Sequence, residues 1–312
     1  MTALPTALQT AALLPYPALA REIASLLGDA SVQVPARLVQ ALPGGSSLFV
    51  MPAFDARLAI TKLITFTPGN AGSGRPTIQG DVLVFDIATG ARRLVLDGPT
   101  VTARRTAAVS LLAAQRLAPN ASGPLLIVGA GAQGRAHLEA FAQGLGVREV
   151  RIASRGAAAA QALAAHARSL GLAASVVADP ERELAECPLV VTCTPASGVV
   201  LRALPRGDAF IAAVGAFTPA MVELDAALCR HIARHGTVIV DTPDARHEAG
   251  DLLQAGLDVA RFADLRSVVQ SSVRAEPVES RRGPVLFKSC GWAGWDLAAA
   301  RCAVDRLDDG AS

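Results

Sequence analysis

The stretch LLIVGAGAQGRAHLEAF, residues 125–141, decides the fold of this chain. Apolar residues run into the glycine turn GAGAQG at residues 129–134, and apolar positions then recur with the spacing of a helix. In such a strand–turn–helix unit the first glycine permits the tight turn, the second lets the backbone approach a pyrophosphate, and the third lets helix and strand pack closely. The helix N-terminus adds free amides and a positive dipole end. We therefore predict dinucleotide binding; the alternative is a purely structural glycine turn.

Strand-like and helix-like segments alternate around this turn from residue 122 to residue 288. The strand segments, such as LVVTCT at 189–194 and AFIAAVGA at 209–216, are continuous apolar runs. Such runs are typical of parallel strands covered on both faces. We predict an α/β protein in which residues 122–288 form a Rossmann-type, doubly wound parallel sheet that binds the dinucleotide.

The preceding residues have a different pattern. A helix is expected over residues 10–28, and residues 48–97 are strand-like, with a hairpin turn in which Gly90 takes a positive φ. A further helix is expected over residues 102–118. We therefore predict that residues 1–118 form a separate, mixed α+β domain.

The last segment of the chain is expected to belong with this first domain. Residues 294–307, GWDLAAARCAVDRL, form an amphipathic pattern with the period of a helix. We predict that the C-terminal helix, within residues 289–312, packs back on the first domain.

Composition and charge exclude several classes of protein. The 312 residues carry a formal net charge of +2 without a basic stripe, so we expect no nucleic acid partner. The five cysteines form no CxxC pair and show no zinc spacing, so we expect no metal and a reducing compartment. Prolines interrupt residues 1–20 and no basic residue precedes Arg21, which argues against a signal peptide. No apolar run is long enough for a bilayer, so we expect a cytoplasmic protein without a membrane partner.

Lysine is almost absent from the chain. Lys62 and Lys288 stand against 27 arginines, and a lysine can exchange a proton where an arginine effectively cannot. Lys62 lies in the apolar strand LAITKLITF and shares a face with Ile60 and Ile64. Burial of its charge would require an anionic partner or a lowered pKa. We predict a functional lysine at position 62; the alternative is a lysine at a strand edge.

The end of the second strand indicates which dinucleotide is bound. Sites for NAD usually place an acidic residue there, against the ribose 2′-hydroxyl. This chain has Ser154 and Arg155, a hydroxyl and a guanidinium that suit a 2′-phosphate. We therefore favour NADPH as the cofactor, with NADH as the alternative. Arg155 could instead only cover the adenine.

The chain as a whole resembles the ornithine cyclodeaminase/μ-crystallin family of nicotinamide-dependent enzymes, from about residue 35 to residue 304. Within that family it looks most like the Δ1-pyrroline-2-carboxylate/Δ1-piperideine-2-carboxylate (ketimine) reductases. The resemblance implies that the first domain forms the substrate site and the interface of a homodimer. The matching segments, in chain order, are VPARLV, MPAF, ITKLITF, VLDGPTVTARRTAAVSLLAA, IVGAGAQGRAHLEAF, AVGAFTPAMVELD, IVDTPDARHEAGDL and VLFKSCGWAGWDLAAA.

The resemblance also implies roles for particular residues. Arg37, Lys62 and Arg105 match the cations that hold the substrate carboxylate, and Lys62 is placed to exchange a proton near the reacting C–N bond. Met51 and Phe217 match further substrate positions, and Lys288 lies in the FKS segment beside the active site. The positions that match cofactor contacts are Thr106, Gly129, Ala130, Gly131, Ala132, Gln133, Gly134, Ser154, Arg155, Thr192, Thr194, Val214 and Ser289.

One loop departs from the cyclodeaminase pattern. Cyclodeaminases carry a catalytic aspartate where this chain has Phe217, and Ala220 and Met221 replace a Gly–Lys pair. A phenyl ring can neither act as a base nor pair with an ammonium. The expected activity is therefore NAD(P)H-dependent reduction of a cyclic imino acid to L-proline or L-pipecolate. The alternatives are an ornithine cyclodeaminase, an alanine-type dehydrogenase, or a non-catalytic protein that binds NADPH or another ligand.

Overall fold

The chain forms two units in the computed structural model, which describes residues 6–70, 73–195, 197–271 and 283–310. The first unit combines Met1–Arg105 with Trp292–Ser312, and the second is Thr106–Gly291. Helix α3 (Gly98–Leu117) runs through the division. The first unit thus contains both ends of the chain, and the second is one continuous segment.

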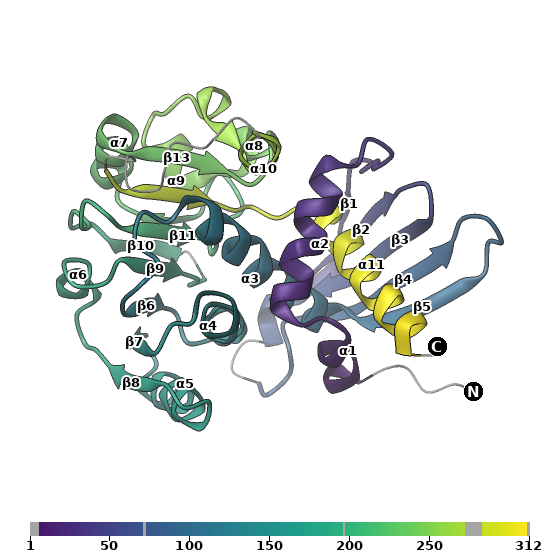
Figure 1. The fold of residues 1–312 in the computed structure, drawn as a ribbon, viewed down its shortest axis with the longest axis horizontal. Helices are drawn as coiled ribbons and strands as arrows, with labels where there is room; N and C mark the ends of the chain where they lie inside the picture. Colours follow the sequence, from purple (N-terminus) through teal and green to yellow (C-terminus); the bar gives the residue numbers. More distant parts are fainter. Residues whose placement is uncertain (1–5, 71–72, 196, 272–282, 311–312) are drawn as a thin grey trace. The chain divides into compact units, whose positions relative to one another are not determined.

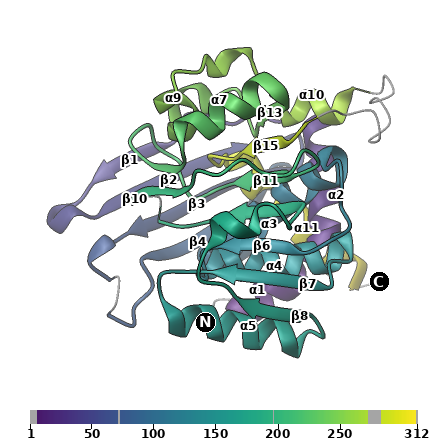
Figure 2. The ribbon, with the colours of Figure 1, turned by 90° about the vertical axis from the view of Figure 1, so that its left-hand side faces the viewer.

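A parallel sheet of eight strands forms the centre of the second unit, in the order β14-β13-β15-β11-β9-β6-β7-β8. Every neighbouring pair in this sheet is parallel, which confirms the predicted doubly wound sheet. Figure 2 looks onto this unit. The strands are β6 (Leu125–Val128), β7 (Glu149–Ala153), β8 (Ala173–Val176), β9 (Leu189–Thr192), β11 (Phe210–Ala213), β13 (Thr237–Val240), β14 (Ala263–Asp264) and β15 (Val285–Lys288).

Helices cover both faces of this sheet (Figure 1), so its central strands are completely buried. This burial explains why these strands are continuous apolar runs in the sequence. Two further strands, β10 (Ser197–Leu201) and β12 (Val222–Leu224), pair with each other in parallel. The remaining helical elements of the unit are α4 (Ala132–Leu145), α5 (Ala157–Ser169), α6 (Pro180–Glu183), α7 (Ala226–His235), α8 (Ala245–Glu248), α9 (Gly250–Gln254), η3 (Val259–Arg261) and α10 (Leu265–Gln270).

An antiparallel sheet of five strands, in the order β1-β2-β3-β4-β5, is the framework of the first unit. Gly90 has a φ of 68° in the turn between the last two strands, as the hairpin pattern predicted. The unit also has the short turns η1 (Pro43–Gly45) and η2 (Pro68–Asn70). The strands are β1 (Leu38–Ala41), β2 (Ser47–Phe54), β3 (Leu58–Phe66), β4 (Ile78–Asp86) and β5 (Arg92–Asp97).

The prediction of helical structure over residues 10–28 is confirmed except at residues 14–15, where the region divides into two helices. Helix α1 (Ala7–Leu13) begins after Thr6, which forms a capping box with Gln9. Helix α2 (Tyr16–Gly28) begins after Pro15. A proline lacks the amide that would continue the first helix, so the chain restarts there.

Helix α11 (Ala293–Gly310) belongs to the first unit, and it is not amphipathic along most of its length. Every residue from Ala293 to Val304 is buried. The helix lies beside α2 and over strands β2 and β3 (Figure 1), so it is covered on all sides. No helix among the described parts of the chain is both long and apolar enough to cross a membrane.

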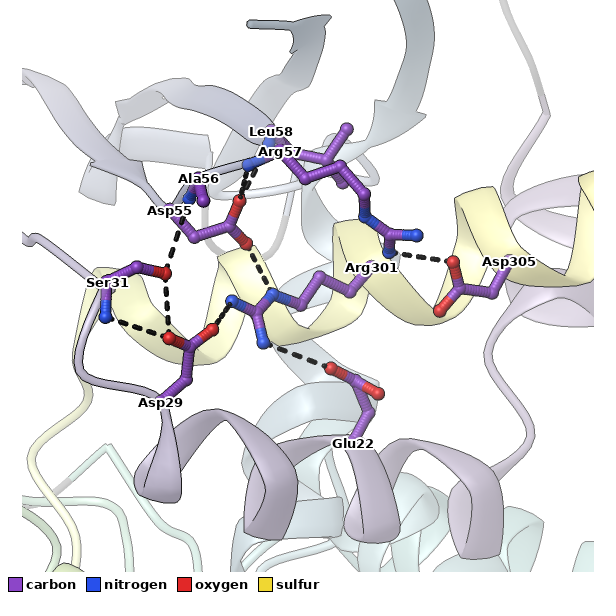
Figure 3. A network of polar contacts seen from close by, with 9 residues as sticks. All are labelled: Glu22, Asp29, Ser31, Asp55, Ala56, Arg57, Leu58, Arg301 and Asp305. Carbon is purple, nitrogen blue, oxygen red and sulfur yellow. Dashed lines mark hydrogen bonds and ion pairs between the residues drawn. The ribbon is translucent and has the colours of Figure 1, made fainter.

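An arginine ties α11 to the rest of the first unit (Figure 3). Arg301 donates to Asp55 in the β2–β3 turn and to Asp29 at the end of α2, both at 2.5 Å, and lies 3.5 Å from Glu22. Hydrogen bonds from Ser31 and from Arg301 lower the pKa of Asp29 to about 2. One guanidinium therefore joins three segments that are far apart in the sequence.

Candidate active site

The glycine turn connects β6 to α4 in the second unit. A Cβ at Gly129, which has a φ of 121°, would lie 2.7 Å from the carbonyl oxygen of Cys193. A Cβ at Gly134 would collide with the carbonyl oxygen of Gly129, so strand and helix meet there without room for a side chain. A Cβ at Gly131 would have no atom within 4 Å. The turn is therefore closed on its inner side and open at Gly131, where a pyrophosphate would approach.

The N-terminus of α4 fits an anion. Its N-cap residue is Gly131, and no side chain caps it. Amides of the first helical turn have no partners inside the helix, and they attract phosphate oxygens. The residues present therefore fit the pyrophosphate of a dinucleotide.

The end of β7 lies beside this turn, because the amide of Gly129 donates to the carbonyl of Ala153 at 2.8 Å. Ser154 and Arg155 follow directly; Ser154 is half-buried and Arg155 is exposed. The structure thus brings these two predicted cofactor residues to the glycine turn.

Glu223 organises the carboxyl ends of two neighbouring strands. It is fully buried and accepts hydrogen bonds from the hydroxyl of Thr192, from the amide and hydroxyl of Thr194, and from the amide of Gly215, at 2.6–2.9 Å. Burial raises the pKa of Glu223, although Lys288 and Thr194 act in the opposite direction. Thr192 and Thr194, which we predicted to be cofactor contacts, are therefore held in place at this edge of the sheet by Glu223.

Asp241 plays a similar part at the end of β15. It is buried and accepts from the hydroxyl of Ser289 and from the amides of Cys290 and Gly291, at 2.8–2.9 Å. Burial raises the pKa of Asp241, although these hydrogen bonds act to lower it. Ser289, another predicted cofactor contact, is therefore oriented by a buried carboxylate.

The loop after β11 carries two more predicted site residues. Val214 is half-buried, and the side chain of Phe217 is 41% exposed. Lys288 holds the start of this loop in place, because its Nζ donates to the carbonyls of Ala213 and Ala216 at 3.2 and 2.5 Å. An exposed phenyl ring at the tip of a supported loop can serve as an apolar wall for a ligand.

Two of the three predicted cations meet at a buried carboxylate in the first unit. Lys62 on β3 is 1% exposed, and its Nζ lies 2.7 Å from Oδ2 of Asp296 on α11. The Nε of Arg105 lies 3.3 Å from Oδ1 of the same carboxylate. Met51 is the cross-strand neighbour of Lys62 and is also buried, whereas Arg37 lies in the exposed segment ahead of β1. The structure thus joins Met51, Lys62 and Arg105, and the charge of Arg37 also acts on Lys62.

Both sequence expectations for a buried Lys62 hold at once. It has an anionic partner, and its pKa is lowered to about 8. Burial is the main cause, and the nearby charges of Arg105 and Arg37 act in the same direction, while Asp296 raises the pKa. A lysine of this kind is protonated at neutral pH and can still give up its proton.

Sequence reasoning missed Asp296. It is completely buried between the buried residues Trp295 and Leu297. The available signal was a lone acidic residue within the apolar run AGWDLAAA, where burial of an unpaired carboxylate would be costly.

These features define an α/β protein whose glycine turn fits a dinucleotide and which has a second, cation-bearing unit. Residues 20–311 match the ornithine cyclodeaminase/mu-crystallin family, and the chain belongs to that family. The matched residues extend beyond the range of 35–304 that the sequence motifs suggested.

Named relatives and a solved structure resemble nearly the whole chain. Delta(1)-pyrroline-2-carboxylate reductase 2 of Burkholderia ambifaria is 40% identical, with 97% of this chain and 95% of the relative covered. The Delta(1)-pyrroline-2-carboxylate/Delta(1)-piperideine-2-carboxylate reductase of Azospirillum brasilense is also 40% identical, over 96% and 94%. The structure of Thermococcus litoralis Delta(1)-pyrroline-2-carboxylate reductase in complex with NADH and L-proline superposes with a TM-score of 0.83 at 23% identity, covering 98% and 95%. This last likeness supports the fold.

Proposed function

We propose that this protein is an NAD(P)H-dependent oxidoreductase that reduces cyclic imino acids, converting Δ1-pyrroline-2-carboxylate to L-proline and Δ1-piperideine-2-carboxylate to L-pipecolate. The observation that carries the proposal is the buried pair of Lys62 and Arg105, which offers positive charge to a carboxylate and a titratable proton to an imine. The names of the two relatives at 40% identity support the same substrate class.

The cofactor proposal rests on the glycine turn and the end of β7. The turn at residues 129–134 and the first turn of α4 would hold the pyrophosphate. Ser154 and Arg155 favour a 2′-phosphate, so NADPH is the proposed cofactor in preference to NADH. Thr106, Thr192, Thr194, Val214 and Ser289 are proposed as further contacts.

The substrate proposal gives every cation a role. Arg37, Lys62 and Arg105 bind the carboxylate of the imino acid, and Lys62 also donates a proton to the ring nitrogen. Protonation turns the imine into an iminium, which is the better hydride acceptor. The reduced nicotinamide, when bound, supplies the hydride. One hydride and one proton added across the C=N bond give the secondary amine of the product, while Met51 and Phe217 provide apolar surface for the ring.

The proposal is tested by mixing the purified protein with Δ1-pyrroline-2-carboxylate and NADPH and following absorbance at 340 nm. A parallel assay contains ornithine and NAD. Rapid NADPH loss, with no proline formed from ornithine, is the expected result. Proline and ammonia from ornithine without imine reduction would instead identify a cyclodeaminase. That result would contradict the interpretation that Phe217 is incompatible with deamination. Inactivity in both assays, with tight NADPH binding, would favour a binding protein.

The preference for NADPH has its own test. Removing the guanidinium in Arg155→Ala should raise KM for NADPH by about tenfold or more, because a charge-assisted hydrogen bond is worth about 1.5–3 kcal/mol. KM for NADH should stay within about twofold. An equal effect on both cofactors would assign Arg155 to the adenine and not to a phosphate.

We also propose a homodimer, which is the assembly that the family resemblance implies. Light scattering after size exclusion should give about twice the chain mass of 32.0 kDa. A mass of one chain would contradict the proposal.

A further inference from the structure

Asp296 divides its carboxylate between two cations. Its Oδ2 lies 2.7 Å from the Nζ of Lys62, and its Oδ1 lies 3.3 Å from the Nε of Arg105. The three side chains come from three elements, since Asp296 is on α11, Lys62 on β3 and Arg105 on α3. One rigid carboxylate therefore sets the distance between the ammonium and the guanidinium.

This carboxylate is placed where a structural role alone would favour an apolar residue. Asp296 is 0% exposed, and the helix around it is buried from Ala293 to Val304. A buried ion pair is often no more stable than apolar side chains of the same volume, because both charges lose their water. The position of Asp296 therefore points to a purpose beyond stability.

The surroundings of Lys62 define what Asp296 can do. The charged groups of the described structure that act most strongly on Lys62 are Asp296 on α11, Arg105 on α3 and Arg37 ahead of β1. Its cross-strand neighbours, Met51 and Val82, are uncharged. Among the described groups that act most strongly on Lys62, Asp296 is thus the one anion against two arginines, and positive charge remains for a substrate carboxylate.

We propose that Asp296 is the positioning residue of the cation site: it holds Lys62 and Arg105 in register and keeps Lys62 protonated at neutral pH. This proposal adds a role for Asp296 to the proposed reduction of imino acids. The tests that measure activity rest on that proposed function. Among the groups that act on Lys62, Asp296 raises its pKa, whereas burial, Arg105 and Arg37 lower it. Without Asp296 the pKa of Lys62 should therefore fall below its value of about 8.

The test uses the fact that the chain has two lysines. Lysine labelled with ¹³C at Cε gives two NMR signals from the full chain, and Lys62→Arg identifies which belongs to Lys62. The wild-type Lys62 signal should titrate near pH 8. In Asp296→Asn, which keeps the shape and removes the charge, the midpoint should fall by about one pH unit or more. This titration needs neither cofactor nor substrate. Its result therefore does not depend on whether the protein reduces imino acids.

A matched control comes from the second lysine. Asp251→Asn makes the same change beside Lys288, whose Nζ lies 3.0 Å from Oδ2 of Asp251. This variant should leave the Lys62 midpoint within about 0.2 pH units of wild type, because the charge that it removes is paired with Lys288. If Asp296→Asn fails to fold, Asp296→Ser, which is smaller and neutral, takes its place. An unchanged Lys62 midpoint in a folded Asp296 variant would overturn the proposal.

Activity gives the second readout. The decline of kcat/KM for imine reduction at high pH should begin about one pH unit lower in Asp296→Asn than in wild type, a loss of about fivefold at pH 8. A purely structural role would lower kcat/KM by the same factor at every pH. A uniform loss together with an unchanged NMR midpoint would therefore assign Asp296 to stability alone.

Discussion

Lys62 and Lys288 are the two lysines of the chain, and they illustrate two uses of a buried ammonium. Each is almost completely buried, and each lies within 3.0 Å of a fully buried aspartate, Asp296 or Asp251. Burial by itself lowers the pKa of both. The pKa of Lys62 nevertheless falls to about 8, whereas that of Lys288 is raised above its ordinary value.

The difference lies in the other groups around each lysine. Arg105 and Arg37 add positive charge near Lys62 and lower its pKa. Lys288 instead has Glu223 as a second carboxylate and donates to the carbonyls of Ala213 and Ala216. Since both lysines are buried, the balance of nearby charge therefore decides which of them can exchange a proton and which serves as a permanent cation.

The largest effect is expected when Lys288 is removed. Lys288→Met would leave Asp251 and Glu223 buried without their shared cation, and such a loss typically costs about 3–5 kcal/mol of the free energy of unfolding. Urea unfolding followed by circular dichroism measures this cost. The double variant Lys288→Met/Asp251→Leu should recover part of it. A stability equal to wild type in the single variant would show that Lys288 is not a structural cation.

The next largest effect concerns activity. Lys62→Ala should lower kcat/KM for imine reduction by well over tenfold, more than about 1.4 kcal/mol, because the site loses a carboxylate ligand and the proton donor. Leu63→Met changes the adjacent side chain, which is 42% exposed on the opposite face of β3, and should leave kcat/KM unchanged. Near wild-type kcat/KM in Lys62→Ala would remove Lys62 from the mechanism.

The pH dependence should distinguish the two lysines directly. Lys62 must be protonated to donate, and its pKa is about 8, so kcat/KM should be constant just below that pH and fall about tenfold per pH unit above it. Lys288, with its raised pKa, stays protonated across the same range. The arginine of the Lys62→Arg variant keeps its charge throughout this range. Most of the activity should therefore be lost, and the remainder should not decline above pH 8. A wild-type profile that is flat from about pH 7 to about pH 10 would contradict the role of Lys62.

The smallest effect is expected for an exposed ion pair whose N···O distance equals that of Lys62 and Asp296. Arg57 and Asp305 lie 2.7 Å apart, the same separation as Lys62 and Asp296, but their side chains are 53% and 43% exposed. Arg57→Ala should change the free energy of unfolding by less than about 1 kcal/mol, because water screens the pair. Thermal unfolding at low and high salt measures it. A loss as large as that of Lys288→Met would mean that burial is not what separates these pairs.

Local sequence patterns were sufficient for the framework and for part of the candidate site. The glycine turn predicted the parallel sheet, because the strand, turn and helix that it requires are adjacent in the sequence. The alternation of Ile60, Lys62 and Ile64 predicted the buried face of β3. The same local view failed at Pro15, where one missing amide divides the predicted helix into α1 and α2. It also read α11 as amphipathic because its charged residues have a helical period.

The sequence by itself thus determined the class of fold, the dinucleotide turn and the burial of Lys62, since each depends on neighbours a few positions away. Only the tertiary structure decided that Asp296 is the partner of Lys62 and that Arg301 joins α11 to Asp29 and Asp55. Both arrangements bring together side chains from distant segments. Such contacts depend on how helices and strands pack, which the period of a single segment does not encode.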